Sequence, residues 1–280
     1  MNKFKNDLKA RGLRGKIKYI EEQNYFVNEG TDLMEDRKLY SYELTSYNEE
    51  GNIIKSFWHS EDDAYSKSIF IYDPTGKILN EEHLYSYDGI LLDKNIFRYD
   101  SSGQIIEKNH YNLDGNFLSR YNYEYNSNEN LVIEYYEKNS GRSLSSISKY
   151  DSNGDEIEYK YYDSKGELWG KIIFKYDSKG NKIEQNSYNS DGSLARKEEF
   201  KYDSNRNMIE NMYYDSETKF NFRSFYEYEL DNNNNWIAQF IIQGRKRLTS
   251  AKRKIVYYGD KDENDYPDWD SPSYKGIEFQ

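Results

Sequence analysis

The chain has 280 residues, of which 36% are hydrophobic and 32% charged, and its net charge is −11. This charge disfavours a nucleic-acid backbone as a partner, whereas a basic protein remains compatible with it. The sequence has no cysteine, which excludes disulfide bonds and thiolate zinc sites, and its 31 tyrosines and 13 phenylalanines favour strands over disorder.

The N-terminal segment, residues 1–39, precedes the regular part of the chain. Residues 2–10 predict a short polar helix or tail, and residues 15–20 an atypical first strand that caps the repeats. Residues 1–18 are basic but lack the apolar middle of a signal peptide, and no apolar run approaches the ~20 residues of a membrane span. We therefore expect a cytoplasmic protein, or an exported or surface protein if a signal peptide was removed from the chain.

Residues 40–228 contain a repeat that begins with a tyrosine. The tyrosine returns after 25 to 27 residues, usually with Asp, Asn or Glu next and often with Gly four residues on. A second Gly-containing turn lies half a period later, so about eight residues remain for each strand. The pattern predicts an all-β fold: a single antiparallel meander of tandem β-hairpin repeats of about 26 residues, curled into an open spiral or a wide barrel-like sheet. The repeat tyrosines are Tyr47, Tyr72, Tyr99, Tyr125, Tyr150, Tyr176, Tyr202 and Tyr228.

Counting from each repeat tyrosine as zero, position +7 is aliphatic, position −2 is mostly aromatic and position −8 is usually apolar. Alternation of side chains along a strand places −8, −2 and the tyrosine on one buried face, with −2 opposite +7. Opposite charges at −1 and +8 are expected as exposed diagonal pairs on the other face. The expected core residues are Ile106, Ile157, Ile183 and Ile209 beside Phe97, Phe174 and Phe200, and the expected pairs are Arg98 with Glu107, Lys149 with Glu158, Lys175 with Glu184, and Lys201 with Glu210.

After the repeats, residues 229–258 predict C-terminal capping strands, built on the apolar runs 236–242 and 253–258. Residues 259–280 form an acidic tail.

No enzyme motif is present, and we expect a non-enzymatic protein without a cofactor or metal site. The only histidines are His59, His83 and His110. His83 and His110 both occupy position +11, two strands and ~9.6 Å apart on a flat sheet, which is too far for one metal ion. Position +11 is instead the candidate ligand or partner surface, and its members are Trp58, His83, His110, Tyr136, Tyr161 and Tyr213.

The Tyr-Asp-x-x-Gly turns at Tyr72, Tyr99, Tyr150 and Tyr176 resemble the YD repeats of bacterial RHS-type proteins, in the small form without a toxin domain. Large members of this family are known for β-shells around a toxin, and related modules are often called carbohydrate-binding. From this resemblance and the acidic charge, we expect a scaffold or immunity-type protein that binds another, basic protein. The alternative is a carbohydrate-binding or cell-surface structural protein that stacks its aromatic columns on sugar rings.

Overall fold

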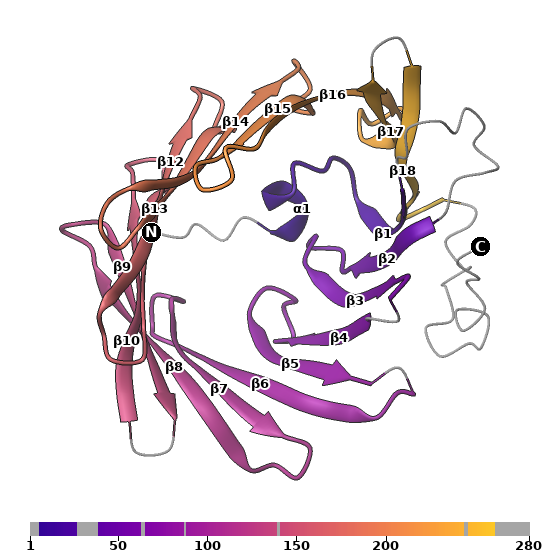
Figure 1. Ribbon diagram of the computed structural model, residues 1–280. Coiled ribbons are helices and arrows are strands. Elements are labelled where there is room, and N and C mark those ends of the chain that lie inside the picture. The colour runs from indigo at the N-terminus through magenta and orange to yellow at the C-terminus, as the bar shows by residue number, and fades with distance from the viewer. Residues whose placement is uncertain are drawn as a thin grey trace. The chain divides into compact units, whose positions relative to one another are not determined.

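The computed structural model describes residues 6–26, 39–62, 65–86, 88–138, 141–243 and 246–260 (Figure 1). These residues form 18 strands of one antiparallel sheet and a single helix of four residues. The prediction of an all-β meander of tandem hairpins is confirmed. Of the predicted acidic tail, residues 261–280 lie outside the described residues.

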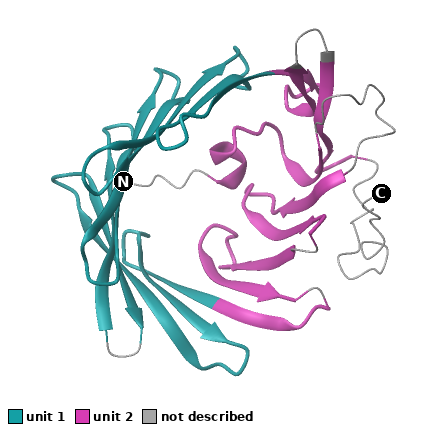
Figure 2. Ribbon diagram, viewed as in Figure 1, with its two compact units in different colours: residues 1–4, 95–225 teal, residues 5–94, 226–280 magenta. Residues whose placement is uncertain are grey.

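The chain divides into two compact units, residues 1–4 with 95–225 and residues 5–94 with 226–280 (Figure 2). In unit 1, each strand pairs with the next one along the chain, and the strands form a curved sheet. Its strands are β7 (Ile105–Asn112), β8 (Phe117–Asn126), β9 (Leu131–Lys138), β10 (Gly141–Tyr150), β11 (Glu156–Tyr162), β12 (Leu168–Tyr176), β13 (Lys182–Asn189), β14 (Leu194–Tyr202) and β15 (Met208–Asp215). Two further strands, β6 (Leu91–Tyr99) and β16 (Asn221–Leu230), contribute residues to both units.

Unit 2 brings the beginning and the end of the described chain together. Its first strand pairs with the second strand on one side and with the last strand on the other. The strands expected as caps of opposite ends, β1 and β18, are thus direct neighbours. The elements of this unit are α1 (Asp7–Ala10), β1 (Ile17–Tyr25), β2 (Leu39–Tyr47), β3 (Ile53–Ser60), β4 (Tyr65–Tyr72), β5 (Leu79–Tyr85), β17 (Trp236–Gln243) and β18 (Lys246–Tyr257).

A β-bulge follows the first turn of the repeat and changes the register that alternation alone predicts. Tyr176 pairs with Lys182 and the preceding Lys175 pairs with Glu184, so Ile183 at position +7 is an extra residue. The same pairing recurs after Tyr150 and Tyr202. The expected −2 to +7 pair is therefore wrong: position −2 lies opposite +9, as in the pair of Phe174 with Gln185.

The aliphatic residues at +7 do not form the expected core. Ile106, Ile183 and Ile209 are each 37% exposed. Because a bulge residue has no cross-strand partner, no neighbouring side chain is placed to cover it.

A second bulge follows the second turn and corrects the expectation for position −8. Tyr162 pairs with Leu168, whereas Tyr161 pairs with Gly170, so Trp169 is the extra residue. Leu168, at −8, therefore lies on the face opposite Tyr161 and the repeat tyrosine. We call the side that carries the repeat tyrosines the tyrosine face and the other side the ladder face.

The charged pairs lie on the ladder face as expected, but they face each other directly instead of diagonally. Lys175 Nζ is 2.8 Å from Glu184 Oε1, and Lys201 Nζ is 3.2 Å from Glu210 Oε2. The expected exposure is wrong for the carboxylates, because the Glu210 side chain is only 9% exposed while that of Lys201 is 60% exposed. Glu210 is covered by Arg223 of the neighbouring strand, whose Nη2 atom lies 2.8 Å from Glu210 Oε1.

Repeat tyrosines connect successive units through their hydroxyl groups. Tyr176 Oη donates to the backbone carbonyl of Glu156 at 2.8 Å, and Tyr202 Oη donates to that of Lys182 at 2.8 Å. Each acceptor stands at position +6 of the preceding unit, immediately before its bulge. Burial raises the pKa of Tyr176 to about 12.

The tightest core lies in unit 2 and occupies both faces of its sheet. On the tyrosine face, Leu8 of α1 packs with Ile17, Ile20 and Tyr47. The opposite face buries a second cluster of Tyr19, Tyr42, Leu44, Phe57 and Val256.

Hydrogen bonds hold the N-terminal segment at two turns of unit 2. Leu8 N donates to the carbonyl of Gly51 at 3.1 Å, and Arg14 N donates to Asn235 Oδ1 at 2.9 Å. The amide of Asn235 donates in return to the carbonyl of Arg14 at 2.7 Å. The segment that follows α1 therefore has a fixed path across the tyrosine face.

Candidate binding site

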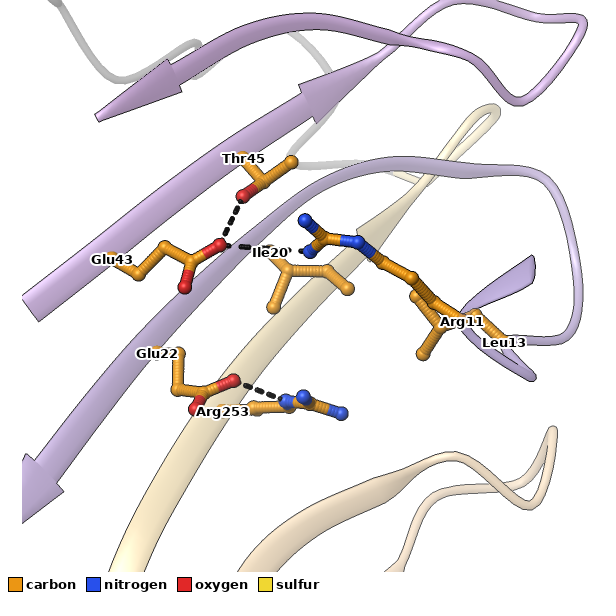
Figure 3. Close-up of a pocket in the computed structure, with 7 residues that line it drawn as sticks. All are labelled: Arg11, Leu13, Ile20, Glu22, Glu43, Thr45 and Arg253. Carbon is orange, nitrogen blue, oxygen red and sulfur yellow. Dashed lines mark hydrogen bonds and ion pairs between the residues drawn. The ribbon is translucent and has the colours of Figure 1, made fainter. Parts of the chain in front are cut away.

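A cavity of about 270 Å³ opens on the tyrosine face of unit 2, beside the segment that follows α1 (Figure 3). Strands β1, β2 and β18 and the N-terminal segment contribute its walls, which combine two ion pairs with apolar side chains. The lining residues are Arg11, Leu13, Ile20, Glu22, Glu43, Thr45 and Arg253.

Strand pairing places three charged residues in one row across this cavity. Glu22 of β1 lies directly opposite Arg253 of β18 and directly opposite Glu43 of β2. Two carboxylates facing each other on neighbouring strands are unfavourable unless cations compensate them. Each of these two carboxylates therefore requires a positive charge close to it.

Arg253 compensates Glu22 in a well-fixed geometry. Its Nε atom is 2.7 Å from Glu22 Oε2, and both side chains are largely buried, at 18% and 19% exposure. The guanidinium carbon also lies 3.4 Å from the ring centroid of Trp236. Ion pairing and stacking on an aromatic ring together hold this arginine in place.

Arg11 compensates Glu43 less tightly. Its Nη1 atom is 3.5 Å from Glu43 Oε1, and the arginine side chain is 46% exposed. The same carboxylate oxygen accepts a hydrogen bond from Thr45 Oγ1 at 2.8 Å. Figure 3 shows the two ion pairs on neighbouring strands, with Arg11 reaching in from the N-terminal segment.

Tyr47 adds a buried polar group near these charges. Its side chain is fully buried, and its hydroxyl has no hydrogen-bond partner among the described residues. Burial raises the pKa of Tyr47, and the charges of Arg11, Glu43 and Arg253 act on the same hydroxyl. An unpaired hydroxyl in the core is costly.

The predicted surface at position +11 is divided between the two faces of unit 2. Trp58 lies on the tyrosine face, directly opposite Glu43, so it stands beside the cavity. His83 lies on the opposite face, because Tyr72 pairs with Leu79 and Ile71 with Glu81, which shifts the alternation by one residue relative to the unit of Tyr176. His83 Nε2 is 2.7 Å from Glu81 Oε2.

In unit 1, the remaining residues of that surface share the tyrosine face. Tyr136 pairs with Tyr121 across the strands, Tyr161 with Gly170, and Tyr213 with Phe222. Alternation places His110 on the same face, where it pairs with Ser119. All four candidates are half-buried.

Sequence reasoning missed the most exposed aromatic residues of unit 1, which follow its second turns. Trp169, a bulge residue, is 70% exposed, and its ring centroid is 6.0 Å from that of Tyr161. Near the turn after β15, Phe222 stacks on Tyr213 with ring centroids 5.2 Å apart. Hairpin turns alternate between the two edges of a meander, so these residues gather at one edge. We call this exposed apolar edge the aromatic rim, and it consists of Leu113, Phe117, Leu168, Trp169, Phe220 and Phe222.

Across the described ranges, no group of three or more His, Asp or Glu side chains is placed to hold a metal ion. Nor does the described part of the chain contain a helix long and apolar enough to cross a membrane.

No protein-family model and no curated protein matches the sequence. Among solved structures, the chain is similar to a porin-like protein from Bacteroides uniformis, with 10% identity over 86% of this chain and 98% of that chain and a TM-score of 0.39. A porin-like protein from Bacteroides vulgatus gives 11% identity, coverages of 88% and 100%, and a TM-score of 0.37. The complex TcdB2-TccC3 gives 10% identity over 82% of this chain and 18% of that chain, with a TM-score of 0.21. Similarities this distant carry no argument about function.

Proposed function

We propose that this is a non-enzymatic repeat protein of the YD type whose work is to bind another protein through the aromatic rim of unit 1. The observation that carries the proposal is the concentration of exposed apolar side chains at that edge, with Trp169 70% and Phe220 56% exposed. Large exposed apolar side chains that gather at one edge can mark interaction sites, and tryptophan and tyrosine are enriched among the residues that dominate binding energy.

The rim rests on a rigid base, which favours binding. Tyr161 lies across Gly170, where even a Cβ atom would meet the tyrosine Cζ at 2.7 Å. Tyr159 stacks on Tyr161 at 6.0 Å, and Trp169 packs against the edge of the pair. Side chains that are already ordered lose less conformational entropy when a partner binds.

The charge of the chain favours a basic partner. At −11, the protein attracts a positively charged protein over a distance of about one Debye length, roughly 8–10 Å at physiological salt. Such a client fits a scaffold or an immunity protein. Salt should then weaken the association, mainly through its rate.

Carbohydrate binding is the second candidate, supported by the flat stack of Tyr159 and Tyr161, whose ring planes differ by 23°. Stacked rings of this kind can receive a sugar face. The rim, however, also contains Phe117, Phe220 and Phe222, which offer no hydrogen bond to sugar hydroxyls. A protein surface therefore fits the whole rim better.

The proposal is tested by affinity capture from source-cell lysate with the wild-type chain, Trp169→Ala and the control Tyr40→Ala as baits. Tyr40 is also an exposed aromatic residue, at 44%, but it lies in unit 2. We expect one basic protein that is retained by the wild type and the control, released by high salt, and lost with Trp169→Ala. Retention of the same protein by Trp169→Ala would contradict the rim as the site. A glycan array probed in parallel identifies the second candidate through binding that salt leaves unchanged.

A further inference from the structure

We propose that the cavity of unit 2 is a binding site for a single guanidinium or ammonium group, which pairs with Glu43 and displaces Arg11 from it. This site is separate from the aromatic rim, and the proposal does not depend on the function of the rim.

The row across β18, β1 and β2 depends on Arg11 for its charge balance. Glu22 and Glu43 face each other, and Arg253 neutralises Glu22 at 2.7 Å. Without Arg11, the row carries one uncompensated negative charge, on Glu43. A ligand with one positive charge balances it.

Arg11 is held loosely. Its contact with Glu43 Oε1 is 3.5 Å long, and nearly half of the arginine side chain is exposed. Exposed ion pairs of this kind contribute little to stability, so a cation from outside can replace this one at small cost. In contrast, Arg253 is largely buried and stacked on Trp236, so it remains in place.

The cavity has a carboxylate oxygen with unused hydrogen-bonding capacity. Glu43 Oε2 has no hydrogen bond or ion pair to another described residue, while Oε1 accepts from Thr45 and Arg11. A guanidinium or ammonium group carries several N–H donors and can satisfy such acceptors together.

The size and lining of the site suit such a group. A cavity of about 270 Å³ has room for a group the size of a side chain, since a water molecule occupies about 30 Å³ in the liquid. Leu13 and Ile20 offer apolar surface for an alkyl stem.

The test is calorimetric titration of the full-length chain with methylguanidinium, comparing the wild type with Arg11→Ala, Arg11→Gln and Glu43→Gln. Removal of Arg11 should tighten binding by up to about fivefold, because the competing ion pair no longer has to be broken. Glu43→Gln should weaken it by about ten- to a hundredfold, the loss of a charge-assisted hydrogen bond.

The matched control is Glu229→Gln. This glutamate is 56% exposed and pairs with Arg247 at 3.3 Å, but it does not line the cavity. Its substitution should leave the affinity unchanged. The proposal is overturned if Glu43→Gln binds methylguanidinium as the wild type does, or if both Arg11 variants, shown to be folded by circular dichroism, bind no more tightly.

A parallel titration with the peptide Gly-Arg-Gly identifies the source of the cationic group. Tighter binding of the peptide than of methylguanidinium, lost with Glu43→Gln, points to an arginine side chain of a protein partner. Equal or weaker binding of the peptide points to a small free cation. Both results support the site, whereas no measurable binding of either probe to the wild type and the Arg11 variants refutes it.

Discussion

Gly170 lies on β12 directly opposite Tyr161, and replacing it with alanine tests the packing beneath the aromatic rim. A Cβ atom at this position would stand 2.7 Å from Tyr161 Cζ, closer still to the tyrosine hydroxyl, and 2.8 Å from the backbone carbonyl of Tyr188. The tyrosine ring can swing away, but the carbonyl belongs to the neighbouring strand β13. The alanine variant must therefore shift backbone as well as side chain.

Overpacking of this kind costs about 1–3 kcal/mol, and loss of glycine's freedom in the unfolded chain offsets about 0.4–1 kcal/mol of it. We expect Gly170→Ala to lower the free energy of unfolding by about 1–2 kcal/mol. Gly141 is the matched control, because it also lies in a strand and a Cβ atom there meets nothing closer than the Lys138 carbonyl at 3.9 Å. Gly141→Ala should stabilise the protein slightly.

Urea denaturation followed by fluorescence gives both values, provided that the slope of each transition matches that of the wild type. Trp169 provides a local reading, since its ring packs against Tyr161 and a displaced tyrosine changes its surroundings. Combining Gly170→Ala with Tyr161→Ala should reduce the cost but not abolish it, because the contact with the Tyr188 carbonyl remains. The predicted clash at Gly170 is refuted if Gly170→Ala is as stable as Gly141→Ala and leaves the tryptophan emission unchanged.

Three further predictions concern the tyrosine hydroxyls, the turns and the docking of α1. Tyr176→Phe removes the 2.8 Å bond to the Glu156 carbonyl and should cost about 0.5–1.5 kcal/mol in urea denaturation; an unchanged midpoint would contradict the role of this bond. The pKa of Tyr176 is raised from 10.0 to about 12, and absorbance titration of the wild type against Tyr176→Phe measures this pKa. The contribution of the Tyr176 hydroxyl to stability is therefore complete below about pH 10 and is lost as the pH rises to about 12. Hydrogen bonds from the Ile78 amide and Thr75 lower the pKa of Asp73 from 3.8 to about 2. The contribution of the Asp73 carboxylate to stability is therefore complete above about pH 4 and is lost as the pH falls towards 2. The unfolding midpoints of the wild type and Asp73→Asn should converge near pH 2. Leu8→Ala should cost about 2–5 kcal/mol, because Leu8 is only 5% exposed in the core of unit 2, whereas the exposed Lys9→Ala should change the unfolding midpoint little.

The period of the repeat and the chemistry of its turns could be predicted from the sequence because both depend on neighbouring residues. In the first turn of one unit, Asp151 Oδ1 accepts hydrogen bonds from the amides of Asn153 and Asp155 at 2.8 and 2.9 Å. Gly154 adopts a φ of 85°, the left-handed conformation that glycine tolerates without strain. Such local rules are written in a few consecutive residues.

The register could not be derived in the same way. The aliphatic residue at +7 is a real signal, but strict alternation interprets it as a core position, whereas Ile183 is an added residue in a bulge. In the repeat around Tyr162, a bulge after the turn shifts the alternation of faces, which is why Leu168 at position −8 leaves the expected core. A bulge is defined by the hydrogen bonds of the partner strand, and that strand is not part of the local sequence.

The sequence by itself determined the all-β class, the hairpin period and the positions of the turns, since turn chemistry and strand length are local properties. Only the tertiary structure decided the composition of the cavity in unit 2. There Arg253 meets Glu22 across 231 positions of the chain, because β1 lies between β2 and β18. The pairing of β1 with β18 closes a very long loop, and no periodicity within the intervening repeats specifies which strand receives the N-terminal segment.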